Sequence, residues 1–212
     1  MLAFIAPGQG AQTPGMLTPW IAKPEALELL KAWSAEIDLD LVRLGTTADA
    51  GEIKDTANAQ PLIVAAGLLG ARALSDYRFA VVAGHSVGEI TAAALAGVIN
   101  EIDAMKLVRA RGIEMAKAAA LKPAGMAAVL GGDRTVVLKA ISDLGLVAAN
   151  DNGAGQIVAA GDLDALAQLA PEGARVRALA VAGAFHTSYM QPAVEPLRAI
   201  AAGIEVHEPR IG

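Results

Sequence analysis

The sequence predicts an α/β protein, in which helices cover a parallel sheet and a smaller unit is inserted into the larger one. Three observations predict this architecture. Apolar runs without polar alternation, at 2–6 and 79–84, are typical of strands buried on both faces. Stretches with helical spacing follow these runs, as in a parallel sheet with crossover helices. From residue 125 onward the order of strand and helix signals changes, which indicates a second unit.

In the first part of the chain, strand and helix signals follow one another in the order expected for a parallel sheet. Its expected elements, in order, are a strand at 2–6, helices at 25–36 and 59–74, a strand at 79–84, and helices at 87–98 and 103–120. A Pro-Gly loop follows the first strand, and such loops at strand ends are where α/β proteins place ligands. The helix at 59–74 is too apolar to lie on the surface.

The second part has a different order of strand and helix signals. Its expected elements are a strand at 125–132, a helix capped by Asp133, strands at 145–150 and 155–161, a helix at 163–169 capped by Asp162, and a strand at 175–183. This βαββαβ succession is the ferredoxin-like order. We therefore expect a small subdomain at 123–186, inserted into a large domain made of 1–122 and 187–212.

Composition excludes several classes of function. With 54% hydrophobic residues the chain can bury a sizeable core, yet no stretch of about 18 residues is continuously apolar. There is no cysteine, and the three histidines lack the spacing of metal ligands. The net charge of −5 argues against a nucleic-acid surface, and the first residues lack the basic start of a signal peptide. We expect a cytoplasmic monomer with no metal, cofactor, membrane or nucleic-acid contact.

The pentapeptide Gly84-His85-Ser86-Val87-Gly88 lies between a predicted strand and a predicted helix. Glycines on both sides of a serine permit a sharp turn that exposes the hydroxyl, as in a nucleophile elbow. The alternative is a tight turn without chemistry, because the bare pattern also arises by chance. In the strand and helix context a nucleophilic Ser86 is favoured, and the N–H of Val87 at the helix start is a candidate oxyanion donor.

A serine needs a base, and His186 in "VAGAFHTSYM" is the best candidate. It follows the last predicted strand of the small subdomain, where the chain returns to the large domain. A structural role is the alternative for a lone histidine. His85 is adjacent to Ser86 and is expected to point away from it, while His207 is expected on the surface.

Seven blocks in order resemble the malonyl-CoA:acyl carrier protein transacylases, in an actinobacterial-like version. The blocks are "APGQGAQ", "NAQPLIVAAG", "AGHSVGEI", "RARGIEMA", "GMAAVLGG", "NGAGQIVAAG" and "GAFHTSYM". The resemblance covers the whole chain and implies a hydrolase-like α/β domain with a ferredoxin-like insertion. The family normally continues for about another third, so the chain is expected to lack the segment whose backbone carbonyl orients the catalytic histidine.

The resemblance also assigns roles. It implies that Ser86 carries the malonyl group and that His186 is the base in a ping-pong transfer from malonyl-CoA to acyl carrier protein. It implies that Gln9 supplies the second oxyanion N–H and that Arg111 binds the malonyl carboxylate. The resemblance further places Phe185 against an α-methyl group and Gln60 near the pocket. Without it, Gln9 is a plain turn, Arg109 and Arg111 are solvated, and Phe185 is a core residue.

Two alternatives stay open at this stage. One is a serine hydrolase or thioesterase, which is the usual meaning of G-x-S-x-G. The other is a non-catalytic module that binds acyl carrier protein or coenzyme A. Whether the pathway is fatty-acid or polyketide synthesis is also open. Because acyl carrier proteins are acidic, we expect a basic patch, whose candidate residues are Arg134, Lys139, Arg175 and Arg177.

Overall fold

The computed structural model describes residues 2–212, which divide into two compact units. Unit 1 comprises the chain up to Ile113 together with Pro196–Gly212, and unit 2 is Glu114–Glu195. The chain passes between the units within two helices, α5 (Glu101–Ala120) and α8 (Gln191–Ala201). From the sequence we expect the junctions instead in the adjoining loops, after 122 and after 186.

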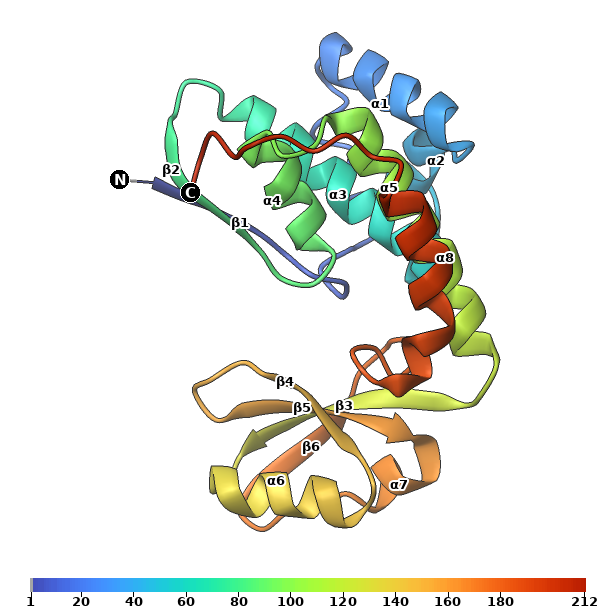
Figure 1. The fold of residues 1–212 in the computed structure, drawn as a ribbon, viewed down its shortest axis with the longest axis vertical. Helices are drawn as coiled ribbons and strands as arrows, with labels where there is room; N and C mark the ends of the chain where they lie inside the picture. The colour runs from blue at the N-terminus through green and yellow to red at the C-terminus, as the bar shows by residue number, and fades with distance from the viewer. Residues whose placement is uncertain (1) are drawn as a thin grey trace. The chain divides into compact units, whose positions relative to one another are not determined.

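Unit 1 combines a small parallel sheet with helices (Figure 1). Besides parts of α5 and α8, its elements are β1 (Leu2–Ala6), α1 (Pro24–Ile37), α2 (Leu41–Thr46), the 3-10 helix η1 (Glu52–Lys54), α3 (Thr56–Ala73), β2 (Phe79–Gly84) and α4 (Gly88–Ala96). Strands β1 and β2 pair in parallel, with Ala6 opposite Gly84. The loops that follow the two strands therefore leave the sheet at the same edge.

One face of this sheet is open in the described residues, and the prediction that its strands are buried on both faces is wrong there. Ile5 is 66% exposed and Val81 is 42% exposed. Since side chains alternate along a strand, these two lie on the face that also bears Ala3 and Ala83. Helix α4 packs against both strands, and Phe4, which points the other way from Ile5, is half-buried. An apolar strand sequence indicates that both faces of the strand can be buried. Whether a face is in fact covered depends on other elements of the fold.

Helix α3 forms the centre of the unit 1 core. Leu62, Val64 and Leu68 are fully buried there, together with Trp33 of α1 and Met105 of α5. The prediction that this segment is not a surface helix is confirmed. The helix begins at Thr56, three residues earlier than expected, because the Asp55 side chain accepts a hydrogen bond from the Ala57 N–H (2.7 Å) and caps the first turn.

Unit 2 is a four-stranded antiparallel sheet with two helices, α6 and α7 (Figure 1). Its elements are β3 (Ala124–Gly131), α6 (Arg134–Asp143), β4 (Val147–Asp151), β5 (Gln156–Asp162), α7 (Leu163–Gln168), β6 (Ala174–Ala178) and the 3-10 helix η2 (Ser188–Met190). The strand order is β4-β5-β3-β6. The predicted ferredoxin-like order is confirmed, as are the capping roles of Asp133 and Asp162, whose side chains each accept two backbone N–H groups.

The two faces of this sheet pack into separate clusters. On β5, Ile157 joins a cluster with Val137 and Ile141 of α6, while its neighbour Val158 joins one with Phe185. Strand β6 ends at Ala178, five residues before the predicted end. The Leu179 N–H still bonds to the Met126 carbonyl (2.9 Å), but the next turn folds the chain out of the sheet. No helix within residues 2–212 is both long and apolar enough to cross a bilayer.

Candidate active site

A sharp turn between β2 and α4 carries Ser86. Its φ is 54°, in the left-handed region that non-glycine residues rarely adopt. Backbone hydrogen bonds hold the turn: the His85 N–H donates to the Ala6 carbonyl (3.0 Å), and the Glu89 N–H donates to the Ser86 carbonyl (3.0 Å). Strain of this kind persists only where the surroundings enforce it, and it is concentrated at functional sites. The turn that strains the backbone is therefore the turn that presents the hydroxyl.

Gly84 is required by this turn, which gives a first prediction. A Cβ at position 84 would overlap the backbone of Gly88 and Glu89. Since backbone atoms cannot rotate away, we expect Gly84→Ala to lower the free energy of unfolding by about 3 kcal/mol or more, measured by urea denaturation. Gly203→Ala is the matched control, because its Cβ meets only the Ile200 carbonyl at 3.5 Å. Equal effects of the two substitutions would contradict the proposed crowding.

The loop after β1 lies against the serine turn. A Cβ at Gly8 would come within 2.6 Å of His85 Nδ1, and one at Gly88 would come within 2.8 Å of the Pro7 carbonyl. Within residues 2–212 the N–H groups of Gln9 and Val87 donate to no protein acceptor. The two segments are thus in contact, and each has a backbone donor available to a ligand oxygen.

Arg111 connects the serine to two glutamines. Its Nη2 donates to Ser86 Oγ (3.3 Å), and its Nη1 donates to Gln60 Oε1 (2.6 Å). Gln60 Nε2 donates in turn to Gln9 Oε1 (3.4 Å). Residues from α5, α3, the loop after β1 and the serine turn therefore meet at one place in unit 1, although up to 51 positions separate hydrogen-bonded partners in the sequence.

The environment of Arg111 is unusual for a cation. Burial lowers the pKa of Arg111, and the negative charge of Glu89 acts in the opposite direction. Gln60, which accepts from the guanidinium, is only 1% exposed. An arginine stays charged in such surroundings, and a buried guanidinium favours an anionic ligand that satisfies its fork of donors. The side chains present so far can bind a carboxylate next to a serine hydroxyl.

Phe185 and His186 belong to unit 2. Phe185 is 5% exposed and packs with Met115, Met126 and Val158, which is the core role considered for it above. His186 has a φ of 58°, again in the left-handed region, so the chain at this predicted base is strained as at Ser86. The Thr187 hydroxyl donates to the Ala184 carbonyl (2.7 Å) and fixes the following turn.

A sequence model of the acyl transferase domain matches residues 3–212. The chain belongs to this family. Curated relatives include the malonyl CoA-acyl carrier protein transacylases of Mycobacterium tuberculosis, 57% identical over 99% of this chain and 72% of the relative, and of Haemophilus influenzae, 35% identical over 99% and 72%. The acyl transferase family assignment thus rests on nearly the whole chain.

Solved structures agree with the assignment. A crystal structure of the transacylase from Mycobacterium tuberculosis superposes with a TM-score of 0.95 at 57% identity, covering 99% of this chain and 72% of that one. The malonyl-CoA:acyl carrier protein transacylase of Xanthomonas oryzae gives 0.90 at 36% identity, with 99% and 71% covered. The predicted α/β fold is confirmed, and acyl transfer is favoured over the hydrolase and the non-catalytic binding module.

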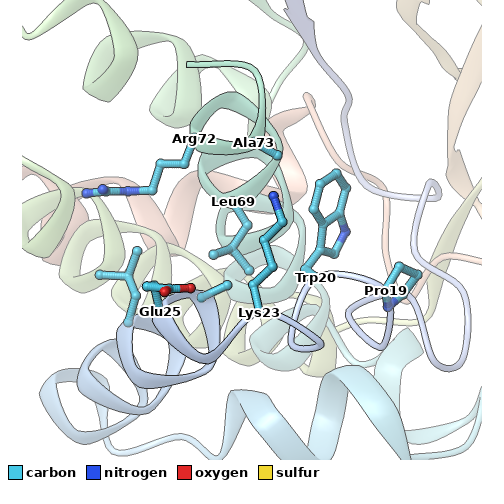
Figure 2. A pocket seen from close by; sticks show the side chains of 9 residues that line it. Pro19, Trp20, Lys23, Glu25, Leu69, Arg72 and Ala73 are labelled. Carbon is cyan, nitrogen blue, oxygen red and sulfur yellow. The ribbon is translucent and has the colours of Figure 1, made fainter. Parts of the chain in front are cut away.

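A separate pocket of about 350 Å³ lies between α1 and α3 of this acyl transferase domain. Figure 2 shows Trp20, Lys23 and Leu69 around it. None of the predicted site residues lines it, and Arg72 at its rim is paired with Glu101 (2.8 Å). Within residues 2–212 there is also no cluster of His, Cys, Asp or Glu side chains suited to a metal ion. We therefore identify the candidate site at Ser86 from its hydrogen bonds and backbone strain, and not from this pocket.

The net positive charge of the predicted basic patch is smaller than the sequence suggests. Arg134 is paired with Asp151 (2.8 Å), and this hydrogen bond holds the pKa of Asp151 below its usual value. Lys139 is paired with Asp143 (2.7 Å). Arg175 and Arg177 are both exposed on β6, with their side chains on the same face of that strand. Two of the four cations are thus balanced by neighbouring carboxylates.

Three residues of the site region were not predicted. Thr56 accepts a hydrogen bond from Gln9 Nε2 (3.3 Å), Arg109 donates to the Ala57 carbonyl (2.9 Å), and Glu89 acts on the pKa of Arg111. One signal for Thr56 exists in the sequence, since it lies four residues before Gln60 and hence on the same helix face.

Proposed function

We propose that the enzyme transfers a malonyl group from malonyl-CoA to the phosphopantetheine thiol of acyl carrier protein, through an ester on Ser86. The observation that carries the proposal is the half-buried guanidinium of Arg111, 3.3 Å from Ser86 Oγ. An esterase for neutral acyl groups does not need a half-buried cation beside its nucleophile. A malonyl ester ends in a free carboxylate, which this cation can bind.

Arg111 accounts for the choice of acyl group. Gln60 occupies Nη1, and a carboxylate can take the other donors of the guanidinium fork. An acetyl group would leave this half-buried charge without a carboxylate ligand, at a cost below the about 3 to 5 kcal/mol of a fully buried pair. Selection for a diacid follows from that penalty. We assign to Phe185 the exclusion of an α-methyl substituent on the malonyl group, on the basis of the family resemblance.

In the first half-reaction Ser86 Oγ attacks the thioester carbonyl of malonyl-CoA while His186 accepts the hydroxyl proton. The tetrahedral oxyanion accepts hydrogen bonds from the N–H groups of Val87 and Gln9. Each bond stabilises the transition state by about 3 kcal/mol, by analogy with single-donor deletions. The C–S bond then breaks, His186 returns the proton to the leaving thiol, and malonyl-Ser86 remains. The role of His186 rests on its sequence motif and on the need of a serine for a base.

In the second half-reaction the carrier thiol attacks the Ser86 ester. His186 takes the thiol proton, the C–O bond to Ser86 breaks, and the proton returns to Oγ, so that malonyl leaves on the carrier. A solved complex of a type II polyketide acyl carrier protein with its malonyl-transacylase supports the choice of partner. That transacylase is 29% identical to this chain with a TM-score of 0.90.

Intact mass spectrometry tests the proposal. Incubation with malonyl-CoA should add the mass of one malonyl group, and a peptide map should place it on Ser86. Acetyl-CoA at the same concentration should give little adduct, because it leaves Arg111 unpaired. Addition of holo-acyl carrier protein should remove the adduct and transfer it to the carrier thiol. The absence of an adduct, or equal loading by the two thioesters, would overturn the proposal.

A further inference from the structure

The hydrogen bonds around Arg111 continue beyond the residues that would touch substrate, and they all run in one direction. Arg111 donates to Gln60, Gln60 donates to Gln9, and Gln9 Nε2 donates to Thr56 Oγ1 (3.3 Å). A guanidinium has no acceptor, so Gln60 must turn its oxygen toward Arg111 and its NH₂ group away from it. The same argument then fixes the orientation of Gln9. Thr56 is left as the final acceptor of the series.

Thr56 is well suited to that position because it cannot move easily. Thr56 is fully buried. The first turn of α3, to which it belongs, is held by contacts on two sides. Asp55 caps it, and Gly112 of α5 approaches so closely that a Cβ there would lie 2.9 Å from the Thr56 carbonyl. The hydroxyl is therefore fixed relative to α5, the helix that carries Arg111.

Arg109 strengthens the same turn. Pro61 lies inside α3 and has no N–H, so the Ala57 carbonyl lacks its normal helical partner. Arg109 Nη1 donates to that carbonyl (2.9 Å) and supplies the missing bond. Since Arg109 and Arg111 lie on the same helix, α5 stabilises the first turn of α3 while presenting the guanidinium that Gln60 orients.

We propose that Thr56 is a positioning residue that, through the side chain of Gln9, aligns both the loop bearing the Gln9 N–H and the Gln60 amide that orients Arg111. Loss of its hydroxyl leaves Gln9 Nε2 without an acceptor, and both glutamine amides can then reorient. The proposal rests on the proposed function for its catalytic consequence, but the placement of the two amides can be measured without turnover.

Thr56→Val removes the hydroxyl and preserves the shape, whereas Thr56→Ser keeps the hydroxyl. The matched control is Thr91→Val, because Thr91 is also fully buried in unit 1 and its hydroxyl has no hydrogen-bond partner among residues 2–212. The first readout is the side-chain amide NMR signals of Gln9 and Gln60. We expect Thr56→Val to shift both signals and to speed their hydrogen exchange, while Thr56→Ser and Thr91→Val leave them near the wild-type values.

The second readout is malonyl loading. We expect Thr56→Val to lower kcat/KM for malonyl-CoA by about 5- to 30-fold, mainly in kcat, with recovery in Thr56→Ser and no loss in Thr91→Val. Unchanged glutamine signals in Thr56→Val would overturn the proposal whatever the activity. Wild-type loading rates in that variant would overturn its catalytic part while leaving malonyl transfer intact. If the wild-type chain loads no malonyl group, the proposed function fails, and the NMR readout still decides the positioning role.

Discussion

Ser86→Ala is expected to abolish formation of the acyl-enzyme and to reduce malonyl transfer by about 10⁴-fold or more. The reason is that the ester of the ping-pong route needs the Ser86 oxygen. The other hydroxyl in the Arg111 network, that of Thr56, belongs to a fully buried residue. Intact mass after incubation with malonyl-CoA measures the first effect. A coupled assay of coenzyme A release measures the second.

Ser142→Ala is the control for this experiment, because Ser142 is an exposed serine on α6. It should load a malonyl group at the wild-type rate. Both variants should unfold at similar denaturant concentrations, since alanine does not relieve the positive φ at position 86. A malonyl adduct that persists in Ser86→Ala would show that another residue carries the acyl group, and it would refute the proposed route.

Arg111→Ala is expected to lower kcat/KM for malonyl-CoA by about 10²- to 10³-fold, because the malonyl carboxylate would enter a half-buried site without its counter-ion. Loading by acetyl-CoA should not fall in parallel, since a neutral acyl group gains when the unpaired cation is removed. The measured quantity is the ratio of kcat/KM values for the two thioesters. It should move strongly toward acetyl-CoA.

Arg72→Ala is the matched control for charge removal. Arg72 lies on the exposed side of α3 and pairs with Glu101, and exposed pairs of this kind contribute about 0 to 1 kcal/mol to stability. This variant should keep the wild-type preference for malonyl-CoA. If Arg111→Ala loses both substrates equally, the guanidinium supports the structure of the site rather than the recognition of the carboxylate.

The sequence predicts the local elements well, because the forces that set them are local. Residues 2–6 and 79–84 are strands with the predicted bounds, and Asp133 and Asp162 cap helices as expected. Helix α8 is not predicted by the same patterns, since Pro192 and Pro196 read as helix breakers. Pro192 is harmless because it lies in the first turn, where its N–H would have no helical partner.

Long-range features are predicted less well. The open face at Ile5 and Val81 depends on which element covers the sheet, and a strand sequence does not contain that information. The candidate site shows the same division. Ser86 stands out because glycines surround it, whereas Thr56 becomes visible only when Gln9, 47 positions away, is seen to donate to it. Arg109 becomes visible only through the carbonyl that Pro61 leaves unbonded.

The one-way series from Arg111 to Thr56 has an evolutionary consequence. Every amide in it is oriented by the group before it, so a substitution at one position changes what its neighbour needs. A single replacement of Gln9, Gln60 or Thr56 therefore leaves a neighbour without its hydrogen-bond partner. A coordinated change at several of these positions can restore all the partners. We expect these positions to covary among homologous sequences, and a library that varies them jointly to contain active combinations that one-at-a-time mutagenesis would never reach.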